Sequence, residues 1–283
     1  MTVNVKKIHA VSGTRVAIQG ELGSFSHQAS LRFFGEEIRP LHVGSFERSF
    51  ESVARKEADF AVIPIENSLA GSIHKNFDLL ARHSLEIVAE TSLRIEHSLI
   101  ACPGMSLRRI RRIYSHPVAL EQCTKLLSRM KGVECFPYYD TAGSVKFLSE
   151  QRFMDAAAIA SVKAAGIYGM KVLKSGIEDD PENYTRFLAL SRRGARAEGG
   201  DKTSIVFGLR NEPGILFKAL SVFALRNIDL SKIESRPIRG TPWQYLFYLD
   251  LSSNANSREC RNALRHLREL TLYFKLLGSY SAV

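Results

Sequence analysis

The feature of this sequence that most constrains its fold is a pattern repeated between about residues 15 and 190: a short apolar strand, a polar turn and an amphipathic helix. The apolar run 59–65, for example, is followed by the turn Glu66-Asn67-Ser68 and by a helical pattern over 72–82. A longer helix is predicted over 119–130. Strands that alternate with helices predict parallel sheets covered by helices on both faces, so this region is predicted to be α/β.

The pattern changes after Ser191. Residues 192–202 are polar and contain several glycines, which is typical of a linker. Residues 203–283 then follow the order strand, helix, strand, strand, helix, strand, which is the split βαβ, or ferredoxin-like, arrangement. A chain of 283 residues is long enough for about two domains. We therefore expect an α/β domain followed by a smaller ferredoxin-like domain.

The composition excludes several classes of protein. Hydrophobic residues make up 45% of the chain and charged residues 24%, which is typical of a globular protein and not of a disordered one. No apolar run reaches the roughly 18 to 20 residues that span a bilayer, and the N-terminus lacks the apolar segment of a signal peptide. The four cysteines show no C-x-x-C spacing, which argues against a zinc site or a disulfide framework. We expect a cytoplasmic protein with no membrane partner.

The formal net charge of +10 suits either a nucleic acid or a small anionic substrate. The densest basic run, residues 108–112, contains no interleaved aromatic residues, and the sequence has no zinc-finger or RNP-like motif. The charge therefore favours a small anionic substrate, and no nucleic-acid partner is expected.

Polar residues cluster where the predicted strands end and the helices begin. The clusters are Gly20 to His27, Glu66 to Ser68, Ser115-His116, Asp140-Thr141 and Asn183 to Arg186. In open α/β sheets, ligands bind at the carboxyl ends of strands, where helix N-termini offer free N–H groups to anions. The same residue types also cap helices and form turns, so the spacing leaves both interpretations open. The chain has no P-loop, complete Rossmann fingerprint, H-E-x-x-H or G-x-S-x-G motif, and we expect no metal and no cofactor.

Three of these segments resemble the signatures of the prephenate dehydratases. They are Pro64-Ile65-Glu66-Asn67-Ser68, Tyr114-Ser115-His116-Pro117 with Gln122, and Asn183-Tyr184-Thr185-Arg186-Phe187. A fourth segment, Glu234-Ser235-Arg236-Pro237 after the Pro213-Gly214 turn, resembles the phenylalanine-binding motif of the ACT regulatory domain found in that family. The similarity extends over about residues 15 to 283, and the motifs follow the family's order.

The resemblance implies a two-lobed catalytic domain with a type II periplasmic-binding-protein-like fold, followed by a ferredoxin-like ACT domain. The implied ranges are a tail at 1–14, a catalytic domain at 15–191, a linker at 192–202 and the ACT domain at 203–283. Within the catalytic domain, one lobe is formed by about residues 15–91 and 177–191, and the other by residues 92–176. The implied activity is that of a carbon–oxygen lyase. It converts prephenate to phenylpyruvate, with loss of carbon dioxide and water, in L-phenylalanine biosynthesis.

By the same resemblance, Thr185 is the catalytic residue and hydrogen-bonds or protonates the leaving hydroxyl. The substrate-binding residues implied are Glu66, Asn67, Ser68, Ser115, Gln122, Thr141, Arg186 and Phe187. For Arg186, the alternation of side chains along a strand leaves a second interpretation open, in which it points away from Thr185 and forms a salt bridge. The implied L-phenylalanine site consists of Asn211, Pro213, Gly214, Ile215, Leu216, Glu234, Ser235, Arg236 and Pro237.

Several alternatives stay open at this stage. Gln19-Gly20-Glu21 and Asp140-Thr141-Ala142-Gly143 also resemble segments of arogenate dehydratases, so arogenate is the alternative substrate. A non-catalytic small-molecule sensor with an ACT module fits the same fold. The ACT resemblance implies a homodimer or homotetramer in which L-phenylalanine binds at a subunit interface and inhibits the enzyme. Ile215 is larger than the residue that many members carry there, so a domain that only dimerises is the alternative to regulation.

Overall fold

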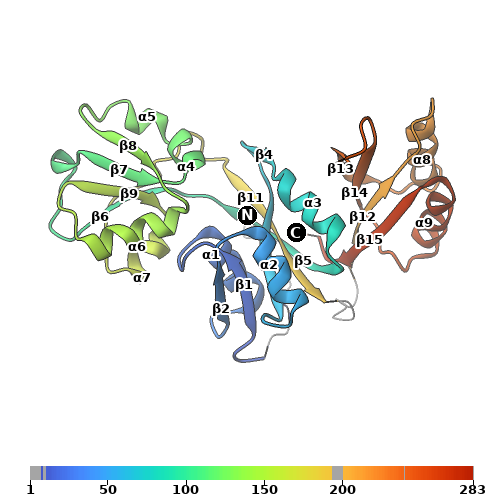
Figure 1. Cartoon of the computed structure of the whole chain (residues 1–283), viewed down its shortest axis with the longest axis horizontal. Helices are drawn as coiled ribbons and strands as arrows, with labels where there is room; N and C mark the ends of the chain where they lie inside the picture. Colours follow the sequence, from blue (N-terminus) through green and yellow to red (C-terminus); the bar gives the residue numbers. More distant parts are fainter. Residues whose placement is uncertain (1–7, 9–10, 193–199, 239, 283) are drawn as a thin grey trace.

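The computed structural model describes residue 8 and residues 11–192, 200–238 and 240–282, and these form three sheets. Most of the expected N-terminal tail and most of the expected linker, residues 193–199 in particular, lie outside the described residues. Figure 1 shows the three sheets arranged along the long axis of the molecule, with the first sheet between the other two. The first sheet is therefore the part of the chain that contacts both neighbours.

The first sheet contains β1 (Arg15–Gln19), β2 (Arg39–Val43), β3 (Phe60–Asn67), β4 (Gly71–Ser72), β5 (Leu85–Arg94) and β11 (Tyr184–Arg192). Its order is β2-β1-β3-β11-β5, with β4 beside β3. Its helices are α1 (Phe25–Phe34), α2 (Phe46–Ala54) and α3 (His74–Arg82). Strands β1, β2 and β3 are parallel as expected, but β11 runs antiparallel to both β3 and β5. The prediction of purely parallel sheets is wrong here, because β11 returns from the second sheet and not from a crossover helix.

The second sheet contains β6 (Ser98–Ala101), β7 (Arg112–Ser115), β8 (Glu134–Pro137), β9 (Ala156–Ala160) and β10 (Lys171–Ser175), in the order β10-β6-β9-β7-β8. Around it lie the 3₁₀ turn η1 (Leu107–Arg109) and the helices α4 (Pro117–Glu121), α5 (Thr124–Leu127), α6 (Thr141–Gln151) and α7 (Val162–Ile167). Four of the five residues of β9 are alanine and all five are buried. These small side chains allow α6 and α7 to pack closely against the sheet.

The single helix predicted over 119–130 is instead two short helices, α4 and α5, with a break at Gln122 and Cys123. The carboxylate of Asp179 accepts hydrogen bonds from the backbone N–H groups of Thr124 and Lys125, both at 2.9 Å. A carboxylate at this position caps a helix N-terminus, so a new helix starts there. The break leaves the side chain of Gln122 at the end of α4, where it reaches residues from outside the second sheet.

The third sheet contains β12 (Lys202–Gly208), β13 (Leu230–Pro237), β14 (Tyr245–Leu251) and β15 (Tyr273–Tyr280), in the antiparallel order β13-β14-β12-β15. Its helices α8 (Ile215–Ala224) and α9 (Arg258–Leu270) pack through Val222, Leu267 and their neighbours onto Phe207 and Leu249 of the sheet. The element order is β-α-β-β-α-β, so the ferredoxin-like prediction is confirmed.

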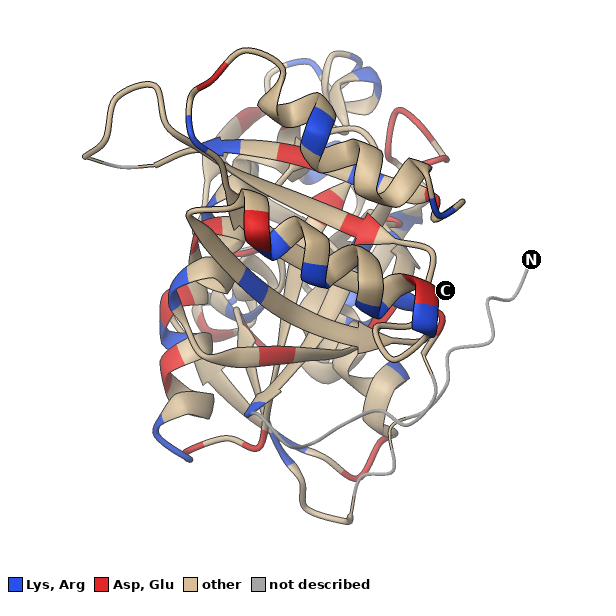
Figure 2. Ribbon diagram, turned by 90° about the vertical axis from the view of Figure 1, so that its right-hand side faces the viewer, with Lys and Arg blue, Asp and Glu red and all other residues tan. Residues whose placement is uncertain are grey.

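The other face of the third sheet packs against the first sheet. Val206, Tyr248 and Tyr280 belong to the same buried cluster as Ile63 and Leu188 of the first sheet. Figure 2, which views the molecule from the side of the third sheet, shows basic and acidic residues interspersed along the ribbon. Among the described residues, no helix is long and apolar enough to cross a membrane.

Candidate active site

Thr185 and Asn67 lie opposite each other on the neighbouring strands β11 and β3. The Asn67 side-chain amide donates a hydrogen bond to Thr185 Oγ1 at 2.9 Å. The Asn67 Oδ1 atom accepts from the backbone N–H groups of Leu69 and Ala70, which holds the amide in this orientation. Because Thr185 Oγ1 accepts from Asn67, the hydroxyl proton of Thr185 is free to be donated to another group.

A chain of amide side chains connects this pair to the second sheet. Asn67 Nδ2 also donates to Asn183 Oδ1 at 2.7 Å, and Asn183 Nδ2 donates to Gln122 Oε1 at 3.0 Å. His97 Nε2 lies 3.0 Å from the same Gln122 oxygen. Burial lowers the pKa of His97, so its imidazole is neutral and Nε2 donates to Gln122. Residues of the first sheet and of the segments next to β11, α4 and β6 therefore hold Thr185 in place.

Three further residues of the expected substrate site occupy different positions. Ser68 Oγ donates to the carbonyl of Glu182 at 2.8 Å and accepts from the N–H of Tyr184 at 2.9 Å, so it fixes the backbone that leads into Thr185. Ser115 is fully buried and donates to the Ile159 carbonyl at 2.6 Å, within the second sheet. Thr141 is the first residue of α6 and is half-buried.

Glu66, Arg186 and Phe187 were also expected to bind substrate. The structure turns Glu66 and Arg186 away from Thr185, whereas Phe187 lies on the same face of β11 as Thr185 but is buried in the core. Glu66 and Arg186 are cross-strand neighbours whose side chains form ion pairs with the third sheet. Arg186 therefore follows the salt-bridge interpretation, because adjacent residues of a strand point to opposite faces. Phe187 is 2% exposed and packs in the core with Phe33, so its role is packing.

The first and second sheets also meet at the turn after β1. Asp140, the N-cap residue of α6, accepts a hydrogen bond from the backbone N–H of Glu21 at 3.0 Å. Ser161 Oγ donates to the Gly23 carbonyl at 2.6 Å. Gly23 has a φ of +86°, and a Cβ atom there would lie 2.5 Å from the Cα of Ala164. Only glycine allows this close approach, so the two lobes meet through backbone contacts.

Asn183, His97 and Asp140 also belong to the candidate site, although they were not among the predicted site residues. Asn183 is the first residue of the motif Asn183-Tyr184-Thr185-Arg186-Phe187, two residues before Thr185, and this position is a signal for its role. Asp140 lies at a strand end and in the segment Asp140-Thr141-Ala142-Gly143, which resembles arogenate dehydratases, whereas His97 had only its position at a strand end as a signal. Among the described residues, no three His, Cys, Asp or Glu side chains form a group that could hold a metal ion.

His27 lies close to the turn that joins the lobes. It is 6% exposed, and its Nδ1 atom accepts a hydrogen bond from the Gly23 N–H at 3.0 Å. Burial, with smaller contributions from Lys163 and His42, lowers the pKa of His27 to about 4. The folded protein therefore holds this imidazole neutral, while the unfolded chain takes up a proton below about pH 6.5.

This difference predicts a loss of stability in acid. The folded-state pKa of His27 lies below the unfolded value, so its contribution is complete above pH 6.5 and decreases towards pH 4. When the pH falls from 7 to 5, the free energy of unfolding of the parent chain should decrease because of His27. We expect this decrease to be smaller by about 2 kcal/mol in His27→Asn. Denaturant unfolding at the two pH values measures the difference. His266→Asn, at an exposed position on α9, is the control, and an equal pH dependence in all three proteins would contradict the assignment.

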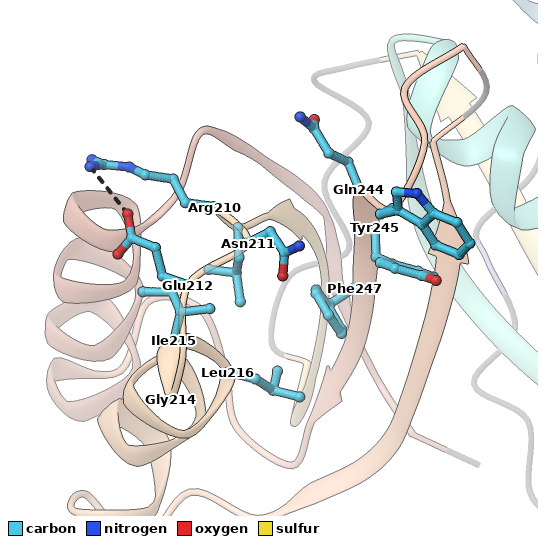
Figure 3. A pocket seen from close by; sticks show the side chains of 11 residues that line it. Arg210, Asn211, Glu212, Gly214, Ile215, Leu216, Gln244, Tyr245 and Phe247 are labelled. Carbon is cyan, nitrogen blue, oxygen red and sulfur yellow. Dashed lines mark ion pairs between the residues drawn. The ribbon is translucent and has the colours of Figure 1, made fainter.

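A cavity of about 230 Å³ lies at the start of α8 in the third sheet's unit. It is lined by Leu209, Arg210, Asn211, Glu212, Gly214, Ile215, Leu216, Trp243, Gln244, Tyr245 and Phe247. Figure 3 shows Ile215 and Leu216 on one side, Tyr245 and Phe247 on the other, and the Asn211 amide between them. Ile215 therefore forms part of the wall and does not fill the cavity.

The remaining residues of the expected effector site fall into two groups. Ser235 and Pro237 of β13 lie directly beside Phe247 and Tyr245 of β14, which line the cavity. Pro213 immediately precedes Gly214 in the exposed turn before α8.

Glu234 and Arg236 point to the other face of β13. Glu234 accepts from Ser72 Oγ at 2.6 Å, and Arg236 pairs with Asp78 of α3 at 3.4 Å. The expectation that these two side chains line the cavity is therefore corrected for this chain, because strand residues alternate between faces.

Comparisons with known proteins agree with this architecture. A family model described as "Prephenate dehydratase" matches residues 16–195, and one described as "ACT domain" matches residues 203–265. The chain is 45% identical to "Arogenate dehydratase/prephenate dehydratase 2, chloroplastic" of Arabidopsis thaliana, over 95% of this chain and 73% of that protein.

Two solved structures are also similar over nearly the whole chain. One is a prephenate dehydratase in complex with L-Phe from Arthrobacter aurescens, with 32% identity, a TM-score of 0.88, and coverage of 95% of this chain and 90% of that one. The other is GqqA, described as a novel type of quorum quenching acylase, with 32% identity, a TM-score of 0.85, and coverage of 95% and 98%.

The fold, the paired threonine and asparagine, and the ferredoxin-like unit with its cavity thus define a two-lobed dehydratase, a lyase, with an ACT domain. The chain belongs to the prephenate dehydratase family.

Proposed function

We propose that Thr185 donates the proton that converts the C4 hydroxyl of prephenate into water. The ring carboxylate leaves as carbon dioxide, and its bonding electron pair enters the ring and expels the hydroxyl. The products are phenylpyruvate, carbon dioxide and water, and the ring becomes aromatic. Hydroxide is a poor leaving group, so a positioned proton donor is the main requirement of the site. The threonine oxygen then recovers a proton from solvent.

The hydrogen bond from Asn67 to Thr185 Oγ1 is the observation that supports this role. A donor beside a hydroxyl oxygen makes the hydroxyl more acidic and stabilises the negative charge that remains after proton transfer. A hydroxyl that acts as a nucleophile needs an adjacent base to remove its proton. Asn67 presents an N–H group at 2.9 Å and no base, which favours proton donation over the acyl transfer named for GqqA.

Prephenate is the proposed substrate, and arogenate is the alternative that the names of the plant relatives suggest. The two differ in the side chain, which carries a keto group in one and an amino group in the other. The reacting ring atoms are the same, so Thr185 would have the same task with both. Parallel assays, with phenylpyruvate formed from prephenate and phenylalanine formed from arogenate, measure the preference. Turnover of neither substrate would contradict the proposed function.

The cavity at the start of α8 is the proposed site for L-phenylalanine as an inhibitor. Its volume is below the roughly 300 to 1,000 Å³ typical of drug-sized ligands, which suits a single amino acid. The free N–H groups at the α8 N-terminus would bind the carboxylate. Glu212 and Asn211 offer oxygens for the ammonium group, and Tyr245 and Phe247 offer aromatic surface. The L-Phe complex of the Arthrobacter aurescens protein supports the proposal.

Gly214 provides a test of this site. Its φ of +74° is unfavourable for a β-branched residue, so Gly214→Val should displace the start of α8. We expect the variant to bind L-phenylalanine at least ~10-fold more weakly by calorimetry and to lose inhibition in parallel. Gly104→Val introduces the same strain at φ +84° in the second sheet's unit and should leave binding unchanged. Absence of both heat and inhibition in the parent chain at millimolar L-phenylalanine would contradict the regulatory proposal.

We further propose a homodimer or homotetramer, formed through the ACT domain, that works in the cytoplasm. Phe217, Leu225 and Trp243 of this domain are 76%, 80% and 77% exposed, and large exposed apolar side chains are typical of interfaces. All four cysteines are free, which fits a reducing compartment. The proposed catalytic and ACT ranges remain 15–191 and 203–283. Light scattering on the purified chain measures the oligomeric state.

A further inference from the structure

The two strands that carry Thr185 and Asn67 have a second pair of polar residues on their opposite face. In the β3–β11 register, Thr185 pairs with Asn67 and Arg186 pairs with Glu66. Because successive strand residues point to opposite faces, the catalytic pair faces one side and the charged pair faces the other. Each catalytic residue is thus bonded through the backbone to a charged residue.

Glu66 and Arg186 face a matching pair on the third sheet. Lys232 of β13 and Asp250 of β14 are cross-strand neighbours in that sheet. Lys232 Nζ lies 2.8 Å from Glu66 Oε1, and Arg186 Nη1 lies 2.7 Å from Asp250 Oδ2. The two cross-strand pairs therefore form two parallel ion pairs between the sheets. We call these four residues the ion-pair cluster.

Most of the cluster is shielded from water. The side chains of Lys232, Asp250 and Arg186 are 14%, 11% and 19% exposed, and Glu66 is 36% exposed. Salt screens the attraction between shielded charges less than that between surface charges. The short distances of these ion pairs also fix the positions of the side chains that form them. Glu90 of β5 also pairs with Arg186, at 2.6 Å, which fixes the guanidinium from a second direction.

The same third-sheet strands extend from the cluster to the cavity at α8. Strand β14 carries Tyr245 and Phe247, which line the cavity, and Asp250 lies three residues further along on the other face. Strand β13 carries Lys232 and, five residues later, Pro237 beside Tyr245. A displacement of β13 or β14 at the cavity would therefore move the cationic or anionic partner of the catalytic strands.

We propose that the ACT domain positions the Thr185–Asn67 pair through the ion pairs Lys232–Glu66 and Asp250–Arg186, which lie on the opposite face of strands β3 and β11. Lys232 and Asp250 are then positioning residues, which act on turnover without contact with the substrate. The proposal rests on the proposed catalytic role of Thr185. It assigns to the ACT domain a role in the catalytic geometry even when no effector is bound.

Four variants of the full chain test the proposal by steady-state kinetics. Asp250→Asn breaks the ion pair with Arg186, and Lys232→Met breaks the pair with Glu66 together with a longer pair, at 3.7 Å, with Glu234. We expect kcat to fall about 10-fold with KM within about twofold in each, because small displacements of a reacting group reduce turnover strongly. Lys232→Arg keeps the charge and should retain kcat within about threefold. Asp78→Asn makes the same chemical change as Asp250→Asn at the Arg236–Asp78 pair, whose side chains are 19% and 17% exposed. This ion pair includes neither Glu66 nor Arg186, so the variant should keep kcat within about twofold.

Amide hydrogen exchange without ligand gives a second readout that does not depend on activity. Backbone amides at 65–68 and 184–187 should exchange faster in Asp250→Asn and Lys232→Met than in the parent chain, by about threefold or more, and should be unchanged in Asp78→Asn. If the parent chain turns over neither prephenate nor arogenate, the proposed function fails, and the exchange rates still decide whether the cluster positions the strands. Parent-like kcat and parent-like exchange in both cluster variants would overturn the proposal.

Discussion

Thr185→Val should leave a folded protein that has lost most of its activity. Valine keeps the size and the β-branch of threonine and removes only the hydroxyl, so strand β11 keeps its packing. Asn67 Nδ2 loses one acceptor but retains Asn183 Oδ1 at 2.7 Å. Without a proton donor for the leaving hydroxide, we expect kcat to fall by at least ~100-fold, the range of general-acid effects. Product formation from prephenate and arogenate measures the loss.

Thr91→Val is the matched control. Thr91 lies on β5 in the same sheet, opposite Phe187, and is fully buried. Its hydroxyl has no hydrogen-bond partner among the described residues, so its removal costs no such bond. We expect Thr91→Val to keep kcat within about twofold, because the Thr91 hydroxyl makes no hydrogen bond to Thr185 or Asn67. A folded Thr185→Val variant with activity within about threefold of the parent chain would contradict the assignment of Thr185 as the proton donor.

Arg186→Met should destabilise the fold more than any other substitution considered above. Burial alone would lower the pKa of Arg186, but Tyr280, Asp250 and Glu90 together raise it, so the guanidinium is held in its charged form. Its removal leaves the carboxylates of Glu90 and Asp250, 4% and 11% exposed, without their main cationic partner. Breaking a buried pair from one side costs about 3 to 5 kcal/mol, and we expect about 3, because Lys202 still pairs with Glu90.

Thermal unfolding measures this effect. For a domain of this size, 3 kcal/mol corresponds to a decrease in Tm of roughly 6 to 12 °C. Arg15→Met removes an arginine of the same sheet whose pair with Asp59 is exposed, and its Tm should stay within about 2 °C of the parent value. Arg186→Lys, which keeps the charge but loses the fork geometry, should lie between the two. Equal Tm values for the Arg186 and Arg15 variants would show that the buried pairs contribute no more than a surface pair.

Much of the architecture was predictable because it depends on local patterns. Strand and helix periodicity predicted the α/β region and the ferredoxin-like unit, and the motif resemblance predicted the family. The antiparallel direction of β11 was not predictable from periodicity, because the alternation of residues along a strand is the same whether it pairs in a parallel or an antiparallel direction. The break between α4 and α5 depends on Asp179, more than 50 residues away, whose carboxylate caps α5.

The same distinction holds within the candidate site. The motif by itself identified Thr185, Asn67, Ser68 and Gln122, and strand alternation already allowed Arg186 to point away from Thr185. What lies across from each face depends on segments far apart in the chain. Only the tertiary structure decided that Arg186 meets Asp250, that Glu66 meets Lys232 and that Gln122 joins Asn183. The physical reason is that the spacing of residues along one strand determines its two faces, whereas the partner of each face is determined by how separate sheets pack together.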